Sequence, residues 1–484
     1  MRHLIVCREM PPAPSGGIGT YVEHIAGLLA AAGETVHVIG QMWAGAERPV
    51  EERPLEERNH GRLVIHRLPF ESWETLRRGQ PRFNPRDRPL NALFRSDLPA
   101  QCFAWQAALL AERLVESEGI DLIEAQEYEA PLWFFQLRRA LGMGPERKPP
   151  CLVHLHSPTE FIARHNEWEP GHPGAATAPR LEAESLGMAD ALLCPSRFLA
   201  GQAEERYGLP AGAVRVIPLP LGDGAEIERG PEVWERGTVC YVGRMERRKG
   251  ILEWLDAAAD VAPRHPEATF EFIGADVLDE SAANRVPRTA RDRFHFRGGQ
   301  PRAAIRGFLA GARIAVVPSR WENFPNTCME AMASGLPVIA TRQGGMAEMI
   351  ADGESGWLVD TADPRELAAA LERALATRPE RLREMGRRAA EDVARLCAND
   401  RVLTAHLAFR AEVAARGAAR SRVPPDGDLA ALRDLAAGRI PDPPKPPLPR
   451  LHLVRPLRKA LRSPRRAAID AWKMLGRYAG RITP

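Results

Sequence analysis

Two glutamates lie eight residues apart in the segment WENFPNTCMEAMASG, residues 321–335. Carboxylates in such a pair can act as acid and base, or they can accept hydrogen bonds from the hydroxyls of a ligand. Pro325 suits the first position of a helix, where a missing N–H costs nothing, and Gly335 suits the residue after the last turn. The spacing therefore predicts Glu322 in a loop and Glu330 inside a helix, in different roles. From the spacing alone, two ordinary helix-end or surface acids are an equally good interpretation.

Several cations follow an apolar strand in the segment YVGRMERRKG, residues 241–250. Arg244 and Lys249 straddle the turn before the next helix. Cations at the carboxyl end of a strand can neutralise a diphosphate, Arg in a bidentate way and Lys as a point charge. A solvated basic turn is an equally good interpretation of the segment, and we assign Arg247 and Arg248 to it.

The helix expected after Pro325 offers a second way to bind an anion. Its first amides, near Asn326 and Thr327, have no partner inside the helix, and the helix dipole favours a negative charge there. We expect this helix start to face Arg244 and Lys249 if the strands before the two segments are neighbours.

A glycine-rich turn, PPAPSGGIGTYVEHI, follows the first apolar run of the chain. The dinucleotide fingerprint G-x-G-x-x-G fails here, because Val22 stands where its last glycine is needed, and we discount a dehydrogenase on that ground. Gly16 and Gly17 lead into a helix N-terminus, where an anion could bind. A tight turn that needs positive φ is the alternative interpretation.

Two histidines lie two residues apart in CLVHLHSP, residues 151–158. Alternation along a strand places His154 and His156 on one face. We expect His156, at the carboxyl end of the strand, to take part in a cleft. His154 is better explained as a hydrogen-bonded core residue.

Apolar runs with helical segments between them organise the chain, and this alternation predicts parallel sheets covered by helices on both faces. The predicted strands of a first series are Leu4–Cys7, Thr35–Ile39, Leu63–His66, Leu122–Ala125, Leu152–His156 and Ala191–Cys194, with a first helix at Tyr21–Ala32. Those of a second series are Thr238–Val242, Thr269–Ile273, Phe294–Phe296, Ile314–Val317 and Val338–Ala340.

The polar segment 222–237 separates the two series and is predicted as a linker. We therefore expect an N-terminal domain at 1–222 and a C-terminal domain at 223–410, with ligands bound between them at the carboxyl ends of the strands.

The last part of the chain, 411–484, differs in composition. Eight prolines lie within 424–449, which predicts a linker or strap. The final 34 residues are strongly basic, and Ile469, Trp472 and Leu475 fall on one helical face. Such a helix can lie on an anionic membrane, or it can pack back onto the protein. The one D-x-D string, 426–428, lies in the proline-rich part and is dismissed as a metal site.

The composition is that of a soluble globular protein, with 44% hydrophobic and 27% charged residues among 484. A net charge of +3 gives no reason to expect a nucleic-acid partner. The seven cysteines are scattered and form no C-x-x-C pair, which favours reduced thiols and a cytoplasmic location, at most peripheral to the inner face of a membrane. We see no signal peptide and no apolar run long enough to span a membrane.

Taken together, the segments resemble glycosyltransferase family 4, a group of retaining nucleotide-sugar transferases with the GT-B fold. The resemblance covers about residues 1–410 and is densest in YVGRMERRKG, FEFIGA and the region from PSRWENFP to SGWLV. It implies an α/β architecture of two doubly wound, Rossmann-like domains facing across a cleft. The N-terminal domain would face the acceptor and the C-terminal domain would hold the donor.

The resemblance also implies roles for single residues. Arg244 and Lys249 would hold the donor diphosphate, which the amides of Gly16 and Gly17 would approach from the other domain. Glu322 would contact hydroxyls of the transferred sugar, and Glu330 the ribose of the nucleotide. His156 would lie at the reacting sugar. The backbone of four further residues would lie near the donor: Phe324, Pro325, Asn326 and Thr327.

The family resemblance further implies a UDP- or GDP-sugar as substrate, no cofactor and no metal. Retention is usually explained in this family by front-face attack, in which the leaving phosphate helps to deprotonate the acceptor. The chain departs from the family in VIPLPLGD, residues 216–223, and in an irregular basic insertion at 70–100, so the acceptor stays open. Two other functions also stay open: a catalytically silent nucleotide-sugar-binding protein and a nucleotide-sugar epimerase on the same fold.

Overall fold

The structure is a computed structural model and describes residues 1–13, 16–43, 48–53, 61–69, 87–169, 171–172, 174–224, 226–236, 238–419 and 428–441. The chain forms two compact units, Met1–Ile440 and Pro441–Pro484, and all described residues but one belong to the first. The predicted basic tail helix lies outside the described residues, as do seven of the eight prolines within 424–449, the greater part of the basic insertion, and Asp426.

The first sheet has the strand order β3-β4-β2-β1-β5-β6-β7-β8. All neighbours are parallel, as predicted, except the edge pair β3 and β4, which is antiparallel and was not predicted. The strands are β1 Arg2–Val6, β2 Thr35–Gln41, β3 Val50–Arg53, β4 Arg62–Leu68, β5 Leu122–Gln126, β6 Cys151–His154, β7 Ala191–Cys194 and β8 Val214–Val216.

The second sheet is parallel throughout, in the order β11-β10-β9-β12-β13-β14. Its strands are β9 Thr238–Val242, β10 Thr269–Ile273, β11 Phe294–Gly298, β12 Ile314–Val317, β13 Val338–Thr341 and β14 Gly356–Val359. In both sheets the order reverses beside the first strand of the series, which is the point where doubly wound folds bind ligands.

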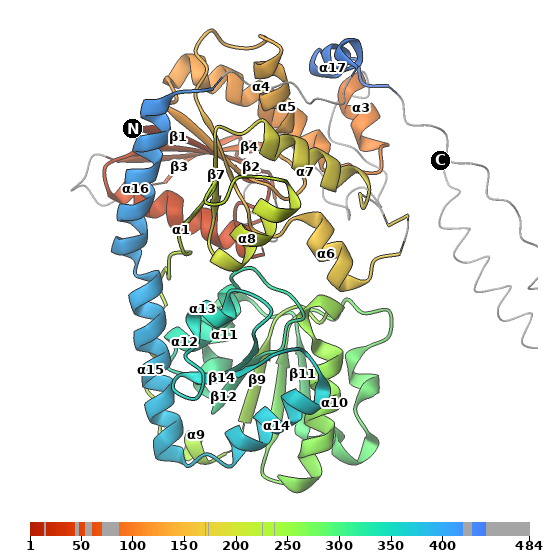
Figure 1. Ribbon diagram of the computed structural model, residues 1–484, viewed down its shortest axis with the longest axis vertical. Coiled ribbons are helices and arrows are strands. Elements are labelled where there is room, and N and C mark those ends of the chain that lie inside the picture. The colour runs from red at the N-terminus through yellow and green to blue at the C-terminus, as the bar shows by residue number, and fades with distance from the viewer. Residues whose placement is uncertain are drawn as a thin grey trace, which may run out of the picture. The chain divides into compact units, whose positions relative to one another are not determined.

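Helices cover both faces of each sheet (Figure 1). With the first sheet lie α1 Gly17–Ala31, α3 Arg88–Phe94, α4 Gln101–Glu118, α5 Trp133–Ala140, α6 Thr159–Asn166, α7 Thr177–Gly187 and α8 Arg197–Arg206. With the second lie α9 Pro231–Glu235, α10 Ile251–Val261, α11 Arg302–Ala310, α12 Asn326–Ala333, α13 Met346–Met349, α14 Pro364–Leu375 and α15 Pro379–Cys397. Short 3-10 turns lie at Arg247–Lys249, Ala262–Arg264, Ala282–Arg285 and Arg288–Arg293.

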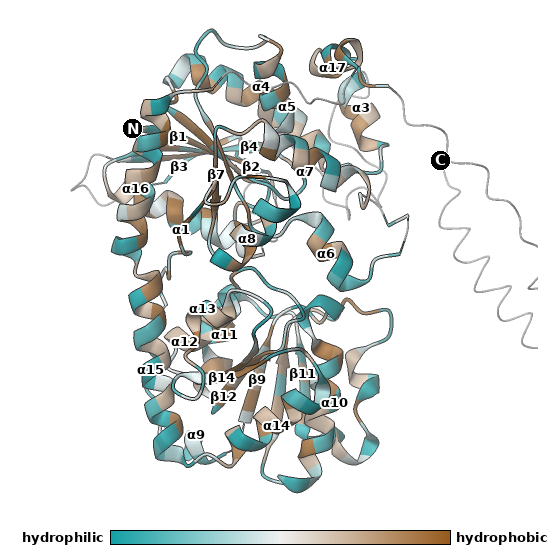
Figure 2. Cartoon of the chain, viewed as in Figure 1, coloured by the Kyte–Doolittle hydropathy of each residue, from teal (hydrophilic) through white to brown (hydrophobic). Residues whose placement is uncertain are grey.

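Alternation along β1 explains the layers. Leu4 and Val6 pack in one hydrophobic cluster with α4 and α5, whereas Ile5 packs in another with α1. Because both faces of the strand are buried, it reads as a continuous apolar run, and Figure 2 shows the strands of both sheets as the most hydrophobic parts of the chain. The cluster around Ile5 continues into the second sheet at Cys240 and Val317, so one apolar core crosses between the two sheets.

The chain returns to the first sheet after α15. Helix α16, Asn399–Arg416, follows at once and packs against α1 and β5. Its apolar residues Val402, Phe409 and Val413 lie in one cluster with Leu122, Leu152 and other residues of the first sheet. The short helix α17, Leu429–Ala436, packs on α5. The domain boundaries that we predict at 222/223 and 410/411 stay predictions.

A buried ion pair fixes α16 on the sheet. The Arg410 guanidinium binds the carboxylate of Glu124 on β5, and both side chains are fully buried. Tyr21 donates a hydrogen bond to the other carboxylate oxygen at 2.8 Å, and His154 Nδ1 lies 3.4 Å from it. Burial alone would raise the pKa of Glu124, but Arg410, His154 and His406 together outweigh burial and hold that pKa well below its usual range.

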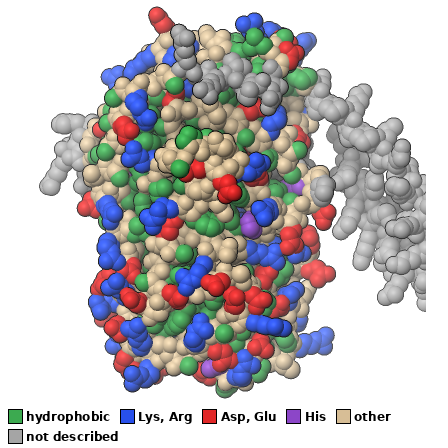
Figure 3. Space-filling model, in the orientation of Figure 1, with side chains coloured by type: hydrophobic (Ala, Val, Ile, Leu, Met, Phe, Trp, Pro, Cys, Tyr) green, Lys and Arg blue, Asp and Glu red, His purple; other side chains and the backbone are tan. Residues whose placement is uncertain are grey.

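Surface charge is mixed in sign. On the face drawn in Figure 3, Lys and Arg are interspersed with Asp and Glu, in keeping with the small net charge. All seven cysteines are buried and unbridged, as predicted. Among the described residues, no helix is long and apolar enough to cross a membrane.

Replacing Arg410 tests the buried pair. Arg410→Met leaves the Glu124 carboxylate buried without a counter-charge, and breaking such a pair costs about 3–5 kcal/mol. We expect a large drop in the urea midpoint of unfolding. The matched control is Arg416→Met on the same helix, because that guanidinium is 56% exposed and its pair with Glu412 is long at 3.6 Å. Equal midpoints for the two variants would contradict the assignment.

A buried histidine predicts acid sensitivity. Burial, with Arg410 adding to it, holds the pKa of His406 well below its usual value of 6.5. Below pH 6.5 the unfolded chain therefore binds a proton that folded His406 does not, and stability falls as the pH falls. His406→Leu removes that proton, so the loss of unfolding free energy on acidification should shrink by up to about 1.4 kcal/mol per pH unit. An unchanged slope between pH 6.5 and 5 would show that His406 is charged in the folded protein.

Candidate active site

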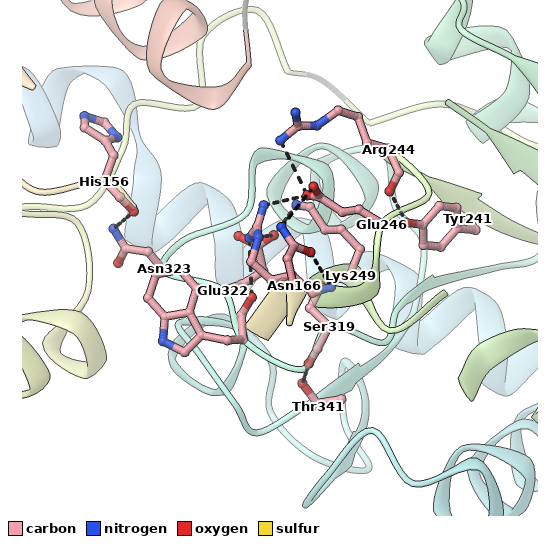
Figure 4. Close-up of polar contacts among 12 residues, drawn as sticks. His156, Asn166, Tyr241, Arg244, Glu246, Lys249, Ser319, Glu322, Asn323 and Thr341 are labelled. Carbon is pink, nitrogen blue, oxygen red and sulfur yellow. Dashed lines mark hydrogen bonds and ion pairs between the residues drawn. The ribbon is translucent and has the colours of Figure 1, made fainter. Parts of the chain in front are cut away.

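Glu322 lies in the loop after β12, as predicted, and it is 5% exposed. Its Oε1 accepts a hydrogen bond from Arg248 Nη1 at 2.8 Å and another from Lys249 Nζ (Figure 4). Burial alone would raise the pKa of this carboxyl, but the two cations outweigh burial and lower it. Glu322 is therefore an ionised carboxylate held inside the protein by two positive charges.

The backbone turn before α10 brings these cations to Glu322. Strand β9 ends at Val242 and is a parallel neighbour of β12, as the predicted arrangement required. Gly250 closes the turn with φ +64°, and a Cβ there would lie 1.8 Å from the carbonyl oxygen of Pro318. Only glycine fits this close approach. The turn therefore places Lys249 beside the carboxyl end of β12.

Arg248 corrects the sequence interpretation. We assigned it to a solvated turn, but it is 4% exposed and binds both Glu322 and Glu246, the latter at 2.8 Å. Asn166 of α6 accepts a hydrogen bond from the Arg248 backbone N–H at 2.8 Å. Arg247 is partly exposed and pairs with Glu167 at 3.2 Å. Of the two arginines that we assigned to a solvated turn, only Arg247 therefore lies at the surface. Burial lowers the pKa of Lys249, and Glu322 opposes that effect.

Arg244 differs from Lys249 in its exposure. Its side chain is 63% exposed, and its Nη2 lies 3.4 Å from Glu246 Oε1. The Arg244 carbonyl accepts a hydrogen bond from the Tyr241 hydroxyl at 2.7 Å. Arg244 is thus linked through Glu246 to Arg248 and on to Glu322, whereas Lys249 binds Glu322 directly.

Helix α12 begins at Asn326, with Pro325 as the capping residue and no side chain capping the amides of the first turn. The predicted start was one residue earlier. Phe324 is buried at 5% exposure and belongs to the apolar core. Asn326 Nδ2 lies 3.4 Å from the Gly17 carbonyl oxygen, so the helix start meets the glycine turn. Thr327 lies in the first turn of the same helix.

The glycine turn leads directly into α1, which begins at Gly17. Neither Gly16 nor Gly17 has a positive φ, so the tight-turn interpretation is wrong for both. The Gly16 amide donates a hydrogen bond to Glu9 Oε2 at 3.1 Å. A carboxylate of the chain itself therefore lies at this helix start, as the helix dipole favours.

Glu330 lies inside α12 and is not a fully solvated surface acid. Its carboxylate, 29% exposed, lies 3.5 Å from Arg302 Nη2. It lines a cavity of about 730 Å³ formed by α1, α11, α12 and the segment 221–227. Arg302 also reaches α1, donating to Thr20 Oγ1 at 3.2 Å. Burial raises the pKa of Glu330, and Arg302 opposes the rise.

The two histidines are both buried, and their rings lie 4.1 Å apart between centroids. Strand β6 ends at His154, so the predicted strand was too long and His156 lies two residues beyond its end. The His156 amide donates to Glu127 at 2.7 Å. Burial, with His154 adding to it, holds the pKa of His156 well below 6.5, so the ring is neutral. Its Nε2 has no hydrogen-bond partner among the described residues.

Glu322 and His156 are brought together through a residue that the sequence analysis missed. Asn323 donates a hydrogen bond from Nδ2 to the His156 carbonyl at 2.9 Å (Figure 4). Arg248, Glu246 and Asn166 were also missed. The sequence offers no signal for Asn323 beyond its place beside Glu322, because its partners are distant in the chain.

The described residues offer few side chains that could bind a metal ion together. Within the described part of the chain, no three or more His, Cys, Asp or Glu side chains are placed to hold a metal ion. The expectation of a metal-free site stays a prediction.

Comparison with protein families gives two matches. The model described as Glycosyltransferase Family 4 matches residues 15–221, and the model described as Glycosyl transferases group 1 matches residues 225–392. Among curated relatives, a glycogen synthase of Mycobacterium tuberculosis is 25% identical over 382 residues, covering 77% of this chain and 85% of that protein. A D-inositol 3-phosphate glycosyltransferase of Acidothermus cellulolyticus is 29% identical over 312 residues, covering 59% of this chain and 67% of the relative.

Solved structures share the fold. Sucrose-phosphate synthase from Thermosynechococcus elongatus aligns over 86% of this chain and all of its own, with a TM-score of 0.65 and 23% identity. Anabaena Alr3699/HepE in complex with UDP-glucose aligns over 85% of this chain and all of its own, with a TM-score of 0.59 and 16% identity. Two parallel-sheet domains of this kind are the GT-B fold that the sequence predicted. The chain belongs to glycosyltransferase family 4, and it is a glycosyltransferase that takes its sugar from a nucleotide-sugar donor.

Proposed function

We propose that the protein transfers a sugar from a UDP- or GDP-sugar to an acceptor hydroxyl with retention of configuration and without a metal. The observation that carries this proposal is the ionised Glu322 carboxylate, buried between Arg248 and Lys249 at the carboxyl end of β12. A buried carboxylate with fixed partners is a precise acceptor for sugar hydroxyls, because its orientation is set before the ligand arrives. UDP is the favoured nucleotide, since the related fold of Alr3699/HepE is known with UDP-glucose.

The donor would lie across α12. Its diphosphate would bind Arg244, Lys249 and the uncapped amides at Asn326 and Thr327. Together these groups supply the positive charge that stabilises a leaving nucleoside diphosphate. Glu330 would accept hydrogen bonds from the ribose hydroxyls, because it lines the large cavity beside the helix. Gly16 and Gly17 would close over the diphosphate from the other domain, where Gly17 already meets Asn326.

The donor and Glu322 compete for Lys249. A phosphate that binds Lys249 weakens its ion pair with Glu322, and Arg248 then keeps the carboxylate in place. The acceptor position on Oε1 that Lys249 leaves can then take a hydrogen bond from a hydroxyl of the sugar, while Arg248 stays bound to the same oxygen. This exchange couples the binding of the diphosphate to the binding of the sugar.

The chemical step breaks the bond between the anomeric carbon and the phosphate oxygen and forms one to the acceptor oxygen on the same face. The acceptor proton passes to the leaving phosphate. Neutral His156 can donate a hydrogen bond to the sugar but cannot supply a positive charge. Arg244, Lys249 and the amides at the start of α12 would therefore stabilise the negative charge on the leaving nucleoside diphosphate.

The acceptor is a glycan, a lipid-linked sugar or a small molecule. A cytoplasmic location with peripheral contact to an anionic membrane through residues 450–484 belongs to the same proposal. It rests on the composition of that segment alone.

Nucleotide recognition is tested by thermal unfolding with UDP, GDP and ADP and their common sugars. A ligand that binds only the folded protein raises the melting temperature by mass action, by an amount that grows with concentration. We expect UDP or GDP to do so without added metal and in the presence of EDTA. If no nucleotide shifts the melting temperature, the proposal fails.

Glu322→Gln tests the sugar contact. The amide keeps the size of the side chain but removes the charge that Arg248 and Lys249 share, so we expect the turnover number to fall by about 100-fold or more. The measurement is release of nucleoside diphosphate from the donor that the melting screen selects. Glu380→Gln, at an exposed position on α15, is the control. Full activity of Glu322→Gln would contradict the sugar contact, whereas no detectable release by the wild-type protein would favour the silent binding protein.

Glu330→Gln tests the ribose contact separately. We expect the affinity for the nucleoside diphosphate to fall about tenfold, since one hydrogen bond to a charged group contributes about 1.5 kcal/mol or more. The turnover number at saturating donor should change little, because the ribose lies away from the reacting atoms. Titration calorimetry gives the affinity, and an unchanged dissociation constant would place the ribose elsewhere.

A further inference from the structure

Three consecutive residues cross the boundary between the two sheets. In the segment 321–323, which carries a single β-bridge at Glu322 between two bends, neighbouring side chains contact different domains. Glu322 turns toward the cations of its own domain, whereas Trp321 and Asn323 contact elements of the first sheet. The residue that is proposed to hold the sugar therefore has an anchor on each side.

Asn323 makes hydrogen bonds with both of its polar atoms although it is 3% exposed. Its Nδ2 donates to the His156 carbonyl at 2.9 Å and to the Leu155 carbonyl at 3.3 Å. Its Oδ1 accepts from the Ser196 hydroxyl at 2.6 Å and from Cys194 Sγ at 3.8 Å. These partners follow β6 and end or follow β7, two adjacent strands of the first sheet.

Trp321 forms the second anchor and is 1% exposed. Its ring stacks on Phe161 of α6, with 5.4 Å between centroids and 4° between planes. Its Nε1 donates to Gln202 of α8 at 2.9 Å. Tryptophan packed in this way contributes both apolar contact and a directed hydrogen bond.

The backbone of residues 321–323 is also held from the second sheet, by the chain that follows β13. Gly345 donates to the Asn323 carbonyl at 2.8 Å, and a Cβ on Gly345 would lie 2.1 Å from that oxygen. Likewise, a Cβ on Gly344 would lie 2.1 Å from the Glu322 carbonyl oxygen. The two glycines let the chain after β13 press directly against the segment, so its backbone is fixed on both sides.

We propose that Asn323 and Trp321 are positioning residues for the transfer reaction, which set the place of Glu322 relative to His156 across the two domains. Asn323 binds the His156 backbone and is joined by one peptide bond to Glu322. The distance between the two predicted catalytic side chains then depends on this buried amide group together with the Trp321 anchor. This inference rests on the proposed function of the same site.

The test compares Asn323→Ala and Asn323→Asp with Asn284→Ala, an exposed asparagine of the same domain. The aspartate keeps the size and the acceptor oxygen but turns a carboxylate toward the two carbonyls, so both donated hydrogen bonds are lost and the anchor is broken. We expect both Asn323 variants to lose about 100-fold in kcat, because misplacement of reacting groups by about 1 Å has that effect. Their dissociation constants for UDP should stay within about threefold, since Arg244, Lys249 and Glu330 are untouched.

Hydrogen exchange in the free protein supplies a readout that needs no turnover. We expect amides in 153–160 and 196–200 to exchange faster in Asn323→Ala, and not in Asn284→Ala. Unchanged exchange together with unchanged kcat would overturn the inference. If wild-type protein turns over no nucleotide sugar, the proposed function fails, while faster exchange still supports the anchor and unchanged exchange still overturns it.

Trp321→Phe decides the matter if Asn323→Ala does not fold. The phenyl ring keeps the stack on Phe161 and loses only the bond to Gln202. A fall in kcat of about threefold to tenfold at unchanged UDP affinity supports the positioning role. An unchanged kcat overturns it.

Discussion

The site depends on one constraint: a carboxylate buried beside two cations cannot move without leaving a charge uncompensated. Glu322 binds Arg248 and Lys249 at 5% exposure, and breaking such an arrangement is costly. The turn closed by Gly250 and the adjacency of β9 and β12 are the means by which the fold meets this constraint. Buried ion pairs of this kind add little to the free energy of unfolding, but they hold the site in a fixed geometry.

A second buried ion pair fixes the geometry of the first domain in the same way. Arg410 on α16 binds Glu124 in the middle of the sheet, and Tyr21 and His154 share the same carboxylate. The rings of His154 and His156 are in contact, so this pair also supports the neutral histidine at the strand end. Since α16 follows α15 directly, the last long stretch of helix joins the domain of Glu322 to the domain of His156.

Local patterns predicted the fold well because each buried parallel strand reads as an apolar run. Ala191–Cys194, Thr238–Val242, Thr269–Ile273 and Ile314–Val317 agree with the structure at both ends. Strands β3, β8 and β14 were missed. The first lies at an edge with half-exposed residues and the second has only three residues, whereas β14 is no shorter than β7 or β12 and its length does not explain the miss. In the site, the positions of Glu322, Lys249 and Glu330 followed from helix and strand boundaries, which are local properties of sequence.

Arg248 and Asn323 could not be predicted in the same way, because their partners are distant in the chain. Arg248 is buried by Glu322, 74 residues later, and Asn323 by Ser196, 127 residues earlier. A basic run normally indicates a solvated turn, and only tertiary contact can reverse that interpretation. The same reasoning explains why the segment 321–323 matters: Glu322 binds cations of its own domain, whereas Trp321 and Asn323 bind residues of the other. A glycosyltransferase whose reacting groups come from two domains needs such a shared element, since neither domain alone fixes the distance between them.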